Sequence, residues 1–306
     1  MGIRHLCWLA GIAFLLLFLS LFSSLQIACG HYVYRISDSG TPTVPLQPRR
    51  PIDEYEQVVI LLVGIDYRPG AWGIEFRDWP AAEVRSRSDV IMLVSLDKSI
   101  STATLMSIPR DTLVEIPGVG RDRLNMAFAK GGISLLMETI KELLTVRIDR
   151  FVIVDFEGFI EFVDAIGGVR MHIDKDLKLP SGRVWLRRGE HHLDGRTALR
   201  LVRHRFGERQ GDISRIARQH DFLKALLKSV SEGGIARILV LIQKSPDIVK
   251  TDLTVFEILS LARQMRSITI EDLDTFILPG SVLQREYWVV DIPAWEEARQ
   301  GIFPYP

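Results

Sequence analysis

Residues 58–65 read VVILLVGI and are followed at once by Asp66-Tyr67-Arg68-Pro69-Gly70. An apolar run of this length, rich in Val and Ile and ended by turn-forming residues, predicts a buried β-strand. Two further β-rich runs follow, VIMLVSL at 90–96 and TATLMSI at 102–108, and the short DKSIS segment between them predicts a hairpin. These three runs predict a β-sheet at the centre of the fold.

The rest of the chain alternates between expected helices and strands. Periodicity and end signals predict helices over 133–144, 157–165, 195–202, 213–230, 235–243 and 255–266, and strands over 151–154, 169–173, 275–278 and 287–290. Strands interspersed with helices in this way are typical of layered α/β proteins. We therefore expect a single α/β/α layered domain with a central mixed β-sheet.

The N-terminal segment differs from the rest because no charged side chain occurs between Leu6 and Gly30. Residues 8–28 read WLAGIAFLLLFLSLFSSLQIA, a run long enough to cross ~30 Å of hydrocarbon as a helix. A cleaved signal peptide normally has an apolar stretch of only ~7–15 residues and a small-residue cleavage site, and no clean A-x-A site follows here. The sequence therefore predicts one retained transmembrane helix, a signal anchor, over residues 7–29.

This anchor divides the chain into unlike parts. Residues 1–6 form a short tail, and residues 30–56 form a spacer with four prolines between Pro42 and Pro51. The positive-inside count does not settle the orientation, since arginines stand on both sides of the anchor. A six-residue tail is easily left in the cytoplasm, so we expect a single-pass protein of the cell membrane with residues 57–306 outside the cell.

Composition excludes several classes of protein. The chain has 306 residues with 38 basic and 38 acidic groups, and 47% of its residues are hydrophobic, which argues against a disordered chain. Zero net charge argues against a diffuse nucleic-acid binder, so we expect no nucleic-acid partner. The two cysteines, Cys7 and Cys29, lie at the edges of the anchor. The globular part therefore has no disulfide, thiolate zinc site or thiol nucleophile.

The predicted hairpin implies where its polar neighbours lie. Its midpoint falls between Ser99 and Ile100, so Asp89 and Arg110 are nearly equidistant from it and lie at the same open end. Asp66 joins them if its strand runs parallel to the run at 102–108, at the sheet edge where α/β proteins usually bind ligands.

Two carboxylates and an arginine beside Arg87 suit a divalent cation held together with an anion, and carboxylates with phosphate are the usual surroundings of Mg²⁺. The alternative interpretation is that Asp66 and Asp89 are ordinary turn and strand-end residues.

A second cluster is basic. Residues 183–218 contain ten arginines, no lysine and four acidic residues, a local charge of +6. Arginine without lysine favours bidentate recognition of phosphate or carboxylate. Arg203 and Arg205 share a face if the backbone is extended there, and Arg215 and Gln219 are neighbours on one helical stripe. A solvated or salt-bridged surface is the alternative interpretation.

Taken together, these segments resemble the LytR-CpsA-Psr family of membrane-anchored cell-wall enzymes. The resemblance spans residues 58–230, more loosely 231–306, and rests on the ordered segments LLVGID (61–66), RSD (87–89), SIPRD (107–111), RLNMAF (123–128), VDAIGGV (163–169), DG (194–195) leading into AL (198–199), RHR (203–205) and D-x-x-R-x-x-x-Q (212–219).

The resemblance implies an extracellular enzyme that takes a glycan phosphate from a polyprenyl-pyrophosphate carrier and transfers it to a cell-wall hydroxyl, usually on peptidoglycan. It implies Mg²⁺, or Mn²⁺, as cofactor, with Asp66 and Asp89 as its ligands and Arg110 as a third catalytic residue. It implies that the pyrophosphate is gripped by Arg87, Arg110, Arg203, Arg205, Arg215 and Gln219.

Two other functions remain open on the same residues. One is a pyrophosphatase in which water replaces the sugar hydroxyl, and the other is a non-catalytic lipid-binding regulator of envelope biogenesis. The stretch between Asp66 and Asp89 is longer than expected for the family and contains Trp72 and Trp79, which leaves the identity of the acceptor open.

Overall fold

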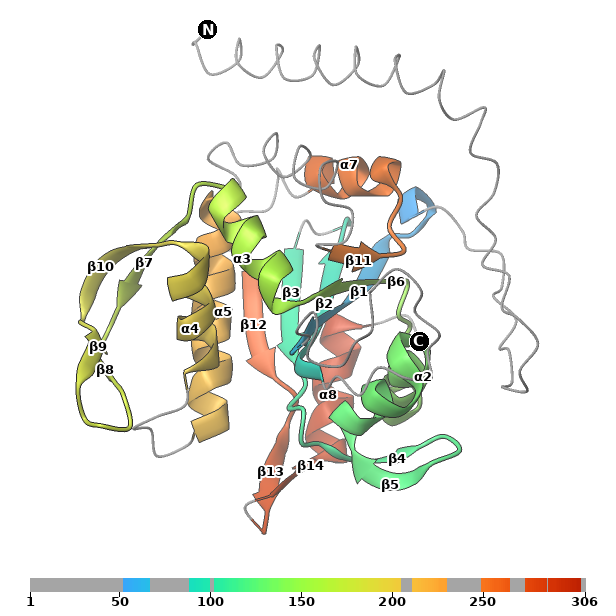
Figure 1. Cartoon of the computed structure of the whole chain (residues 1–306). Coiled ribbons are helices and arrows are strands. Elements are labelled where there is room, and N and C mark those ends of the chain that lie inside the picture. Colours follow the sequence, from blue (N-terminus) through green and yellow to red (C-terminus); the bar gives the residue numbers. More distant parts are fainter. Residues whose placement is uncertain are drawn as a thin grey trace, which may run out of the picture. The chain divides into compact units, whose positions relative to one another are not determined.

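The computed structural model of the chain describes residues 52–66, 88–99, 102–204, 211–229, 249–264, 273–284 and 286–303. All of them belong to the unit Arg50–Pro306. A six-stranded sheet in the order β11-β6-β1-β2-β3-β12 lies at its centre (Figure 1). These strands are β1 (Gln57–Ile65), β2 (Ser88–Asp97), β3 (Thr102–Ser107), β6 (Arg150–Val154), β11 (Val249–Thr251) and β12 (Leu273–Ile277).

The sheet is mixed, as predicted. β1 is parallel to β6, and β3 is parallel to β12. The pairs β1–β2, β2–β3 and β6–β11 are antiparallel. β1 and β3 therefore run in the same direction on either side of β2, which satisfies the condition for Asp66 to share a sheet edge with the end of β3.

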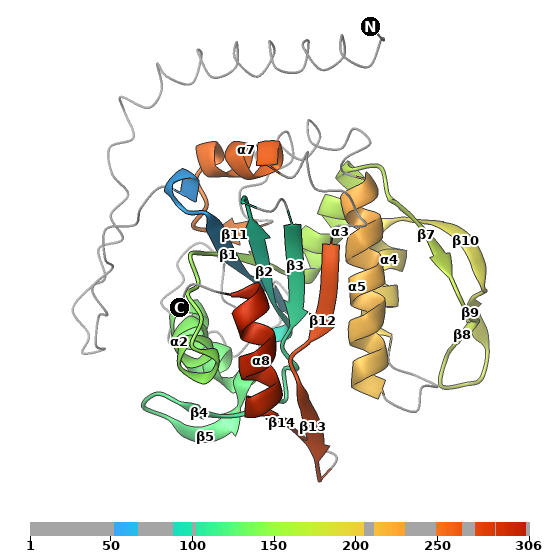
Figure 2. The same cartoon turned by 180° about the vertical axis from the view of Figure 1, so that it is seen from behind.

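Helices cover both faces of the sheet. Alternate residues of β1 point to opposite faces and therefore enter different cores. Val59, Leu61, Val63 and Ile65 pack with α2 (Leu124–Leu144) and α8 (Ile292–Ile302), which lie side by side in both views (Figures 1 and 2). Val58 and Ile60 pack with leucines of α5 (Gly211–Ser229) and α7 (Val255–Gln264). This arrangement confirms the predicted α/β/α layering.

A smaller core lies on the far side of α5 from the sheet. It joins α5 to α3 (Phe156–Ala165), α4 (Gly195–Arg203) and the antiparallel pair β7 (Val169–Ile173) and β10 (Gly189–Leu193), visible at the edge of both cartoons (Figures 1 and 2). The short pair β8 (Leu177–Lys178) and β9 (Val184–Leu186) extends it. This second core places α4 beside α5.

The strands β8, β9, β10 and β11, most strands of two hairpins and one helix were not predicted. The hairpins are β4–β5 (Leu113–Ile116 and Gly120–Arg123) and β13–β14 (Gly280–Leu283 and Tyr287–Val290), and only the last of these four strands was expected. Their strands are four residues long, too short for a period-two pattern to identify. Helix α8 begins at Ile292 with a proline in its first turn, behind the Asp291 cap.

The boundaries of two predicted elements were wrong. The helix expected over 133–144 begins nine residues earlier, at Leu124, and is kinked at Gly131 and Gly132, whose non-helical backbone interrupts the apolar period. The strand expected over 275–278 spans Leu273–Ile277. The helix expected over 235–243 lies outside the described residues.

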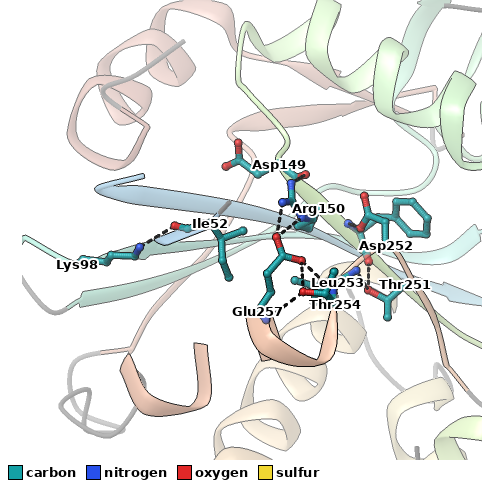
Figure 3. Close-up of polar contacts among 10 residues, drawn as sticks. Ile52, Lys98, Asp149, Arg150, Thr251, Asp252, Leu253, Thr254 and Glu257 are labelled. Atoms are coloured by element: carbon teal, nitrogen blue, oxygen red, sulfur yellow. Dashed lines mark hydrogen bonds and ion pairs between the residues drawn. The ribbon is translucent and has the colours of Figure 1, made fainter. Parts of the chain in front are cut away.

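Helix α7 is attached to β6 by a buried ion pair between Arg150 of β6 and Glu257 of α7 (Figure 3). Glu257 also accepts hydrogen bonds from the backbone N–H and hydroxyl of Thr254, while its own N–H donates to the Thr254 hydroxyl. This reciprocal pattern is a capping box at the start of α7. The same glutamate therefore caps the start of α7 and attaches the helix to the sheet.

The predicted tail, transmembrane helix and most of the spacer fall on residues 1–51, outside the described residues. Within the part of the chain that the structure describes, no helix is both long and apolar enough to span a membrane.

Candidate functional site

The antiparallel register of β2 and β3 brings Asp89 and Arg110 together. Met92 pairs with Ser107 and Asp97 with Thr102, so the start of β2 and the end of β3 lie at one edge of the sheet. There the Nη1 of Arg110 forms an ion pair and hydrogen bond with the Oδ1 of Asp89. The position inferred from the hairpin midpoint is confirmed.

A β-bulge at Asp89 was not foreseen. Gly64 pairs with Val90, but the next residue, Ile65, pairs with Ser88, so Asp89 is an extra residue on β2. Bulges bend a strand and redirect a side chain, and they are frequent beside active sites. Gly64 permits the close approach at this point, since a Cβ on it would lie only 3.0 Å from the Cβ of Val90.

Asp66 follows β1 directly, at the same edge. Its Oδ2 lies 3.7 Å from the Nη2 of Arg203, the last residue of α4. The Arg203 guanidinium also stacks 4.0 Å from the ring centroid of Phe156. Two acid–base pairs, Asp89–Arg110 and Asp66–Arg203, therefore stand at the ends of neighbouring strands.

Helix α4, which carries Arg203, is fixed at its start by two aspartates. Asp194 caps the helix by accepting from the N–H of Thr197, and Asp164 of α3 accepts from the N–H of Gly195 at 2.7 Å. A side chain at Gly195 would collide with the backbone of Ile160, since a Cβ there would lie 2.3 Å from its carbonyl oxygen. These residues position the helix.

Helix α5 holds the other end of α4. Gln219 donates from Nε2 to the carbonyl of Val202 at 3.1 Å, and Arg218 donates from Nη1 to the carbonyl of His204 at 2.6 Å. Arg215 lies one turn before Gln219 and is 3% exposed. In this structure Gln219 thus supports the segment that carries Arg203, and its expected contact with phosphate stays a prediction.

A buried pair between α5 and β3 was missed by the sequence analysis. The Nε2 of His220 lies 2.7 Å from the hydroxyl of Ser107, and both side chains are buried. Burial, and secondarily the nearby Lys224 ammonium, lowers the pKa of His220 from 6.5 to about 4. The imidazole is therefore neutral at physiological pH. Only the antiparallel register and the packing of α5 reveal this pair, so no local motif identifies it.

The basic window does not converge as a whole. The exposed Arg183, Arg187 and Arg188 lie near β9 and β10, and Arg200 stacks 4.4 Å from the ring centroid of Trp185. Among the described arginines of the window, Arg203 forms an ion pair with Asp66. The +6 charge therefore corresponds partly to solvated surface, the alternative that the sequence analysis left open. Arg87 and Arg205 lie outside the described residues.

The donor set limits how a cation could be held here. Across the described ranges, no group of three or more His, Cys, Asp or Glu side chains is placed to hold a metal ion. Asp66 and Asp89 still offer two carboxylates at adjacent strand ends, and Mg²⁺ is commonly bound by one or two carboxylates completed by substrate phosphates and water. The site fits Mg²⁺ together with a phosphate ligand.

Comparison with known proteins gives a consistent result. Residues 32–301 match the LytR_cpsA_psr family. The chain is 33% identical over 220 residues to the polyisoprenyl-teichoic acid–peptidoglycan teichoic acid transferase TagV of Bacillus subtilis, covering 69% of this chain and 56% of TagV. It is 30% identical over 295 residues to TagU of Bacillus cereus, a transferase of the same name, covering 90% of this chain and 88% of TagU.

Solved structures share the fold. The crystal structure of B. subtilis TagV superimposes with a TM-score of 0.67 at 28% identity, covering 82% of this chain and 98% of that one. The structure of TagT bound to LIIa-WTA superimposes with a TM-score of 0.65 at 25% identity, covering 85% of this chain and 95% of that one. With the ordered motifs, the mixed α/β fold and these matches in agreement, the chain belongs to the LytR-CpsA-Psr family.

Proposed function

We propose that this protein transfers a glycopolymer phosphate from a polyprenyl-pyrophosphate carrier to a hydroxyl of the cell wall, in peptidoglycan, and releases polyprenyl phosphate. The names of TagU and TagV, which describe teichoic acid transfer from a polyisoprenyl carrier to peptidoglycan, support this reaction class. The observation that carries the proposal is the pairing of Asp89 with Arg110 and of Asp66 with Arg203 at one sheet edge.

The reaction needs a site that binds a pyrophosphate and tolerates charge on the leaving group. The acceptor hydroxyl oxygen forms a bond to the phosphorus that bears the glycan, and the bond from that phosphorus to the bridging oxygen breaks. Arg110 and Arg203 supply guanidinium forks that match phosphate oxygens, and positioning with charge stabilisation accounts for most catalysis of phosphoryl transfer. The two guanidinium groups would oppose the charge that develops on the departing polyprenyl phosphate.

Asp66 and Asp89 are the proposed ligands of a cofactor cation, Mg²⁺ or Mn²⁺. When bound, the cation would neutralise pyrophosphate charge and act as a Lewis acid on its oxygens. The proton of the acceptor hydroxyl also needs a base, and these two carboxylates are the candidates. Cation binding lowers the basicity of a carboxylate oxygen. The carboxylate oxygen that takes the proton would therefore be one that does not ligate the cation.

We further propose that a single N-terminal helix anchors the protein in the cell membrane and that the described domain faces the cell wall. A polyprenyl carrier resides in the membrane, so an anchor with a Pro-rich spacer would keep the domain within reach of its donor. The donor, the peptidoglycan acceptor and the membrane are then the three partners of the protein.

Product analysis tests the reaction. The full-length chain in detergent micelles is incubated with a synthetic polyprenyl-pyrophosphate disaccharide, Mg²⁺ and purified peptidoglycan. We expect polyprenyl phosphate and peptidoglycan-bound disaccharide phosphate, with turnover lost on chelation and reduced at least about 100-fold in Asp89→Asn. Release of soluble disaccharide phosphate together with polyprenyl phosphate, without transfer to peptidoglycan, would instead establish a pyrophosphatase. Tight donor binding without any turnover would establish the lipid-binding regulator.

A further inference from the structure

Arg110 is flanked by a second carboxylate in addition to Asp89. Its Nε lies 3.5 Å from the Oδ2 of Asp111, while its Nη1 pairs with Asp89. The side chains of Arg110, Asp89 and Asp111 are 19%, 25% and 29% exposed, so all three are partly withdrawn from water. Ion pairs in such places are screened less than those at an open surface. The guanidinium is therefore held from two sides.

Asp111 is itself held by a chain of contacts that leads away from the site. Its Oδ1 lies 3.7 Å from the Nε of Arg123, the residue that precedes α2. The Nη2 of Arg123 lies 3.7 Å from the Oε2 of Glu286, and its guanidinium stacks 5.1 Å from the ring centroid of Tyr287 in β14. Charges of alternating sign thus connect the sheet edge to the β13–β14 hairpin.

The backbone around Arg110 is fixed by the same two elements. At the start of α2, the N–H groups of Asn125 and Leu124 donate to the carbonyls of Arg110 and Thr112, at 3.0 and 2.8 Å. The N–H of Trp288 in β14 donates to the carbonyl of Asp111 at 3.0 Å. Three consecutive carbonyls are bonded in this way, so the backbone that carries Arg110 is fixed, and its side chain contacts the carboxylates of Asp89 and Asp111.

We infer that Asp111 is a positioning residue that keeps the Arg110 guanidinium directed at the pyrophosphate when Asp89 turns to the cation, and that Arg123 holds Asp111 in place for this task. The inference rests on the proposed function, in which Asp89 serves a cation and so cannot remain the main partner of Arg110.

An arginine side chain that loses its partner regains rotamer freedom, and that freedom must be lost again when it grips the pyrophosphate. Asp111 is not a proposed cation ligand, so its contact with Arg110 persists both without and with a bound cation. A carboxylate on the opposite end of the guanidinium leaves the Nη groups available to phosphate oxygens.

The test is the binding of inorganic pyrophosphate, measured by calorimetry in saturating Mg²⁺ with the full-length chain in detergent micelles. Charge alone predicts that Asp111→Asn tightens binding, since it removes a negative group beside an anion site. Positioning predicts the opposite sign, and we expect Asp111→Asn to raise the Kd about tenfold. The matched control is Glu296→Gln, which removes a carboxylate paired with Arg299 at 2.8 Å on α8, and its Kd should stay within twofold of the wild-type value.

A double-mutant cycle identifies the route of the effect. In an Arg110→Gln background, Asp111→Asn should no longer weaken binding, because there is no guanidinium left to position. Unchanged or tighter binding by Asp111→Asn, or an equal loss in both backgrounds, would overturn the inference.

If Asp111→Asn fails to fold by circular dichroism, Arg123→Gln takes its place, with an expected loss of about threefold, and no loss would again overturn the inference. Absence of pyrophosphate binding by the wild-type chain would instead count against the proposed function itself.

Discussion

The geometry of the candidate site depends on single residues, and Arg110 matters most among them. Its planar guanidinium pairs with Asp89 and lies near Asp111, so it presents a fork of donors in a fixed direction. A lysine ammonium, which is a point charge on a flexible side chain, would supply the same net charge without that direction. The chemistry proposed for this site needs the direction as well as the charge.

Arg110→Lys tests this requirement. The variant keeps the positive charge but loses the bidentate fork, so we expect the rate of glycan transfer to fall about 100-fold. The thermal midpoint should change little, since the residue is partly exposed. The measurement is the initial rate of disaccharide incorporation into peptidoglycan at saturating donor. A rate within threefold of wild type would show that charge alone is sufficient at this position.

At this scale the sequence predicted the partners but not their geometry. Counting outward from the hairpin midpoint placed Asp89 opposite Arg110, because antiparallel pairing fixes which residues share an end. The bulge at Asp89 could not be predicted, since it depends on a register shift between β1 and β2 that the apolar pattern leaves open. The distances from Arg203 to Asp66 and from Asp111 to Arg123 depend on tertiary packing, so the sequence pattern could not predict them either.

Among the elements, α5 connects the site to the core. It bonds the last turn of α4 through Gln219 and Arg218, and it bonds β3 through His220 and Ser107. As the pH falls below about 6.5, the His220 imidazole stays neutral in the folded state but takes up a proton in the unfolded chain. The contact between α5 and the sheet therefore makes stability depend on pH.

His220→Gln tests that dependence. The folded pKa of about 4 lies below the unfolded value of 6.5, so the unfolded chain binds more protons between these values and stability falls as pH decreases through this window. The contribution of His220 is complete above pH ~6.5, and up to about 3 kcal/mol is lost by pH ~4. Urea unfolding at pH 7 and pH 4.5 should show a smaller decrease for His220→Gln than for wild type.

The exposed His172 provides the matched control for this experiment. His172→Gln should decrease in stability between the two pH values as much as wild type does. An equal decrease in His220→Gln and wild type would contradict the assignment of the acid sensitivity to the buried pair.

Glu257 of α7 forms a buried ion pair with Arg150 of β6, and Glu257→Ala should therefore be costly. Burial alone would raise the pKa of Glu257, but hydrogen bonds from Arg150 and Thr254 outweigh it and hold the pKa below its ordinary value. Removing the carboxylate leaves Arg150 charged and buried, so we expect a loss of about 3 kcal/mol in the free energy of unfolding by urea titration.

The control for this substitution is Glu296→Ala, which removes a surface ion pair with Arg299 three residues along α8. It should cost less than about 1 kcal/mol. A similar cost for both variants would mean that the contact between α7 and the sheet does not depend on the buried charge pair.

At the scale of elements, prediction succeeded where a segment was long and apolar. The strands β1, β2 and β3 lie within two residues of their expected bounds, because buried strands read as continuous apolar runs. The hairpins β4–β5 and β13–β14 were mostly missed, although β14 and β5 support the segment that carries Arg110. Short, partly exposed strands owe their stability to neighbours far away in sequence.

For the whole molecule, we predict a domain on the outer side of the cell membrane. Protease added to intact cells should remove the domain beyond Arg49 and leave a short anchored fragment, detected with an N-terminal tag. Cells with permeabilised membranes serve as the comparison. Complete protection in intact cells would reverse the proposed orientation and separate the domain from its expected acceptor.

The zero net charge of the chain is an average over parts that behave differently. Residues 1–35 contain two arginines and no acidic residue, so the remainder has 36 basic and 38 acidic groups. At the sheet edge, Asp89 is paired with Arg110 and Asp66 with Arg203. Such a site carries little net field at a distance and is suited to one phosphate ligand rather than to a polyanion.

The central claim is that this sheet edge binds a pyrophosphate, and an experimental structure with Mg²⁺ and a non-hydrolysable polyprenyl-pyrophosphate analogue tests it most directly. We expect the pyrophosphate between Arg110 and Arg203, the cation on Asp66 and Asp89, and Asp111 still beside Arg110. A pyrophosphate bound elsewhere, with both ion pairs at the sheet edge intact, would contradict this claim.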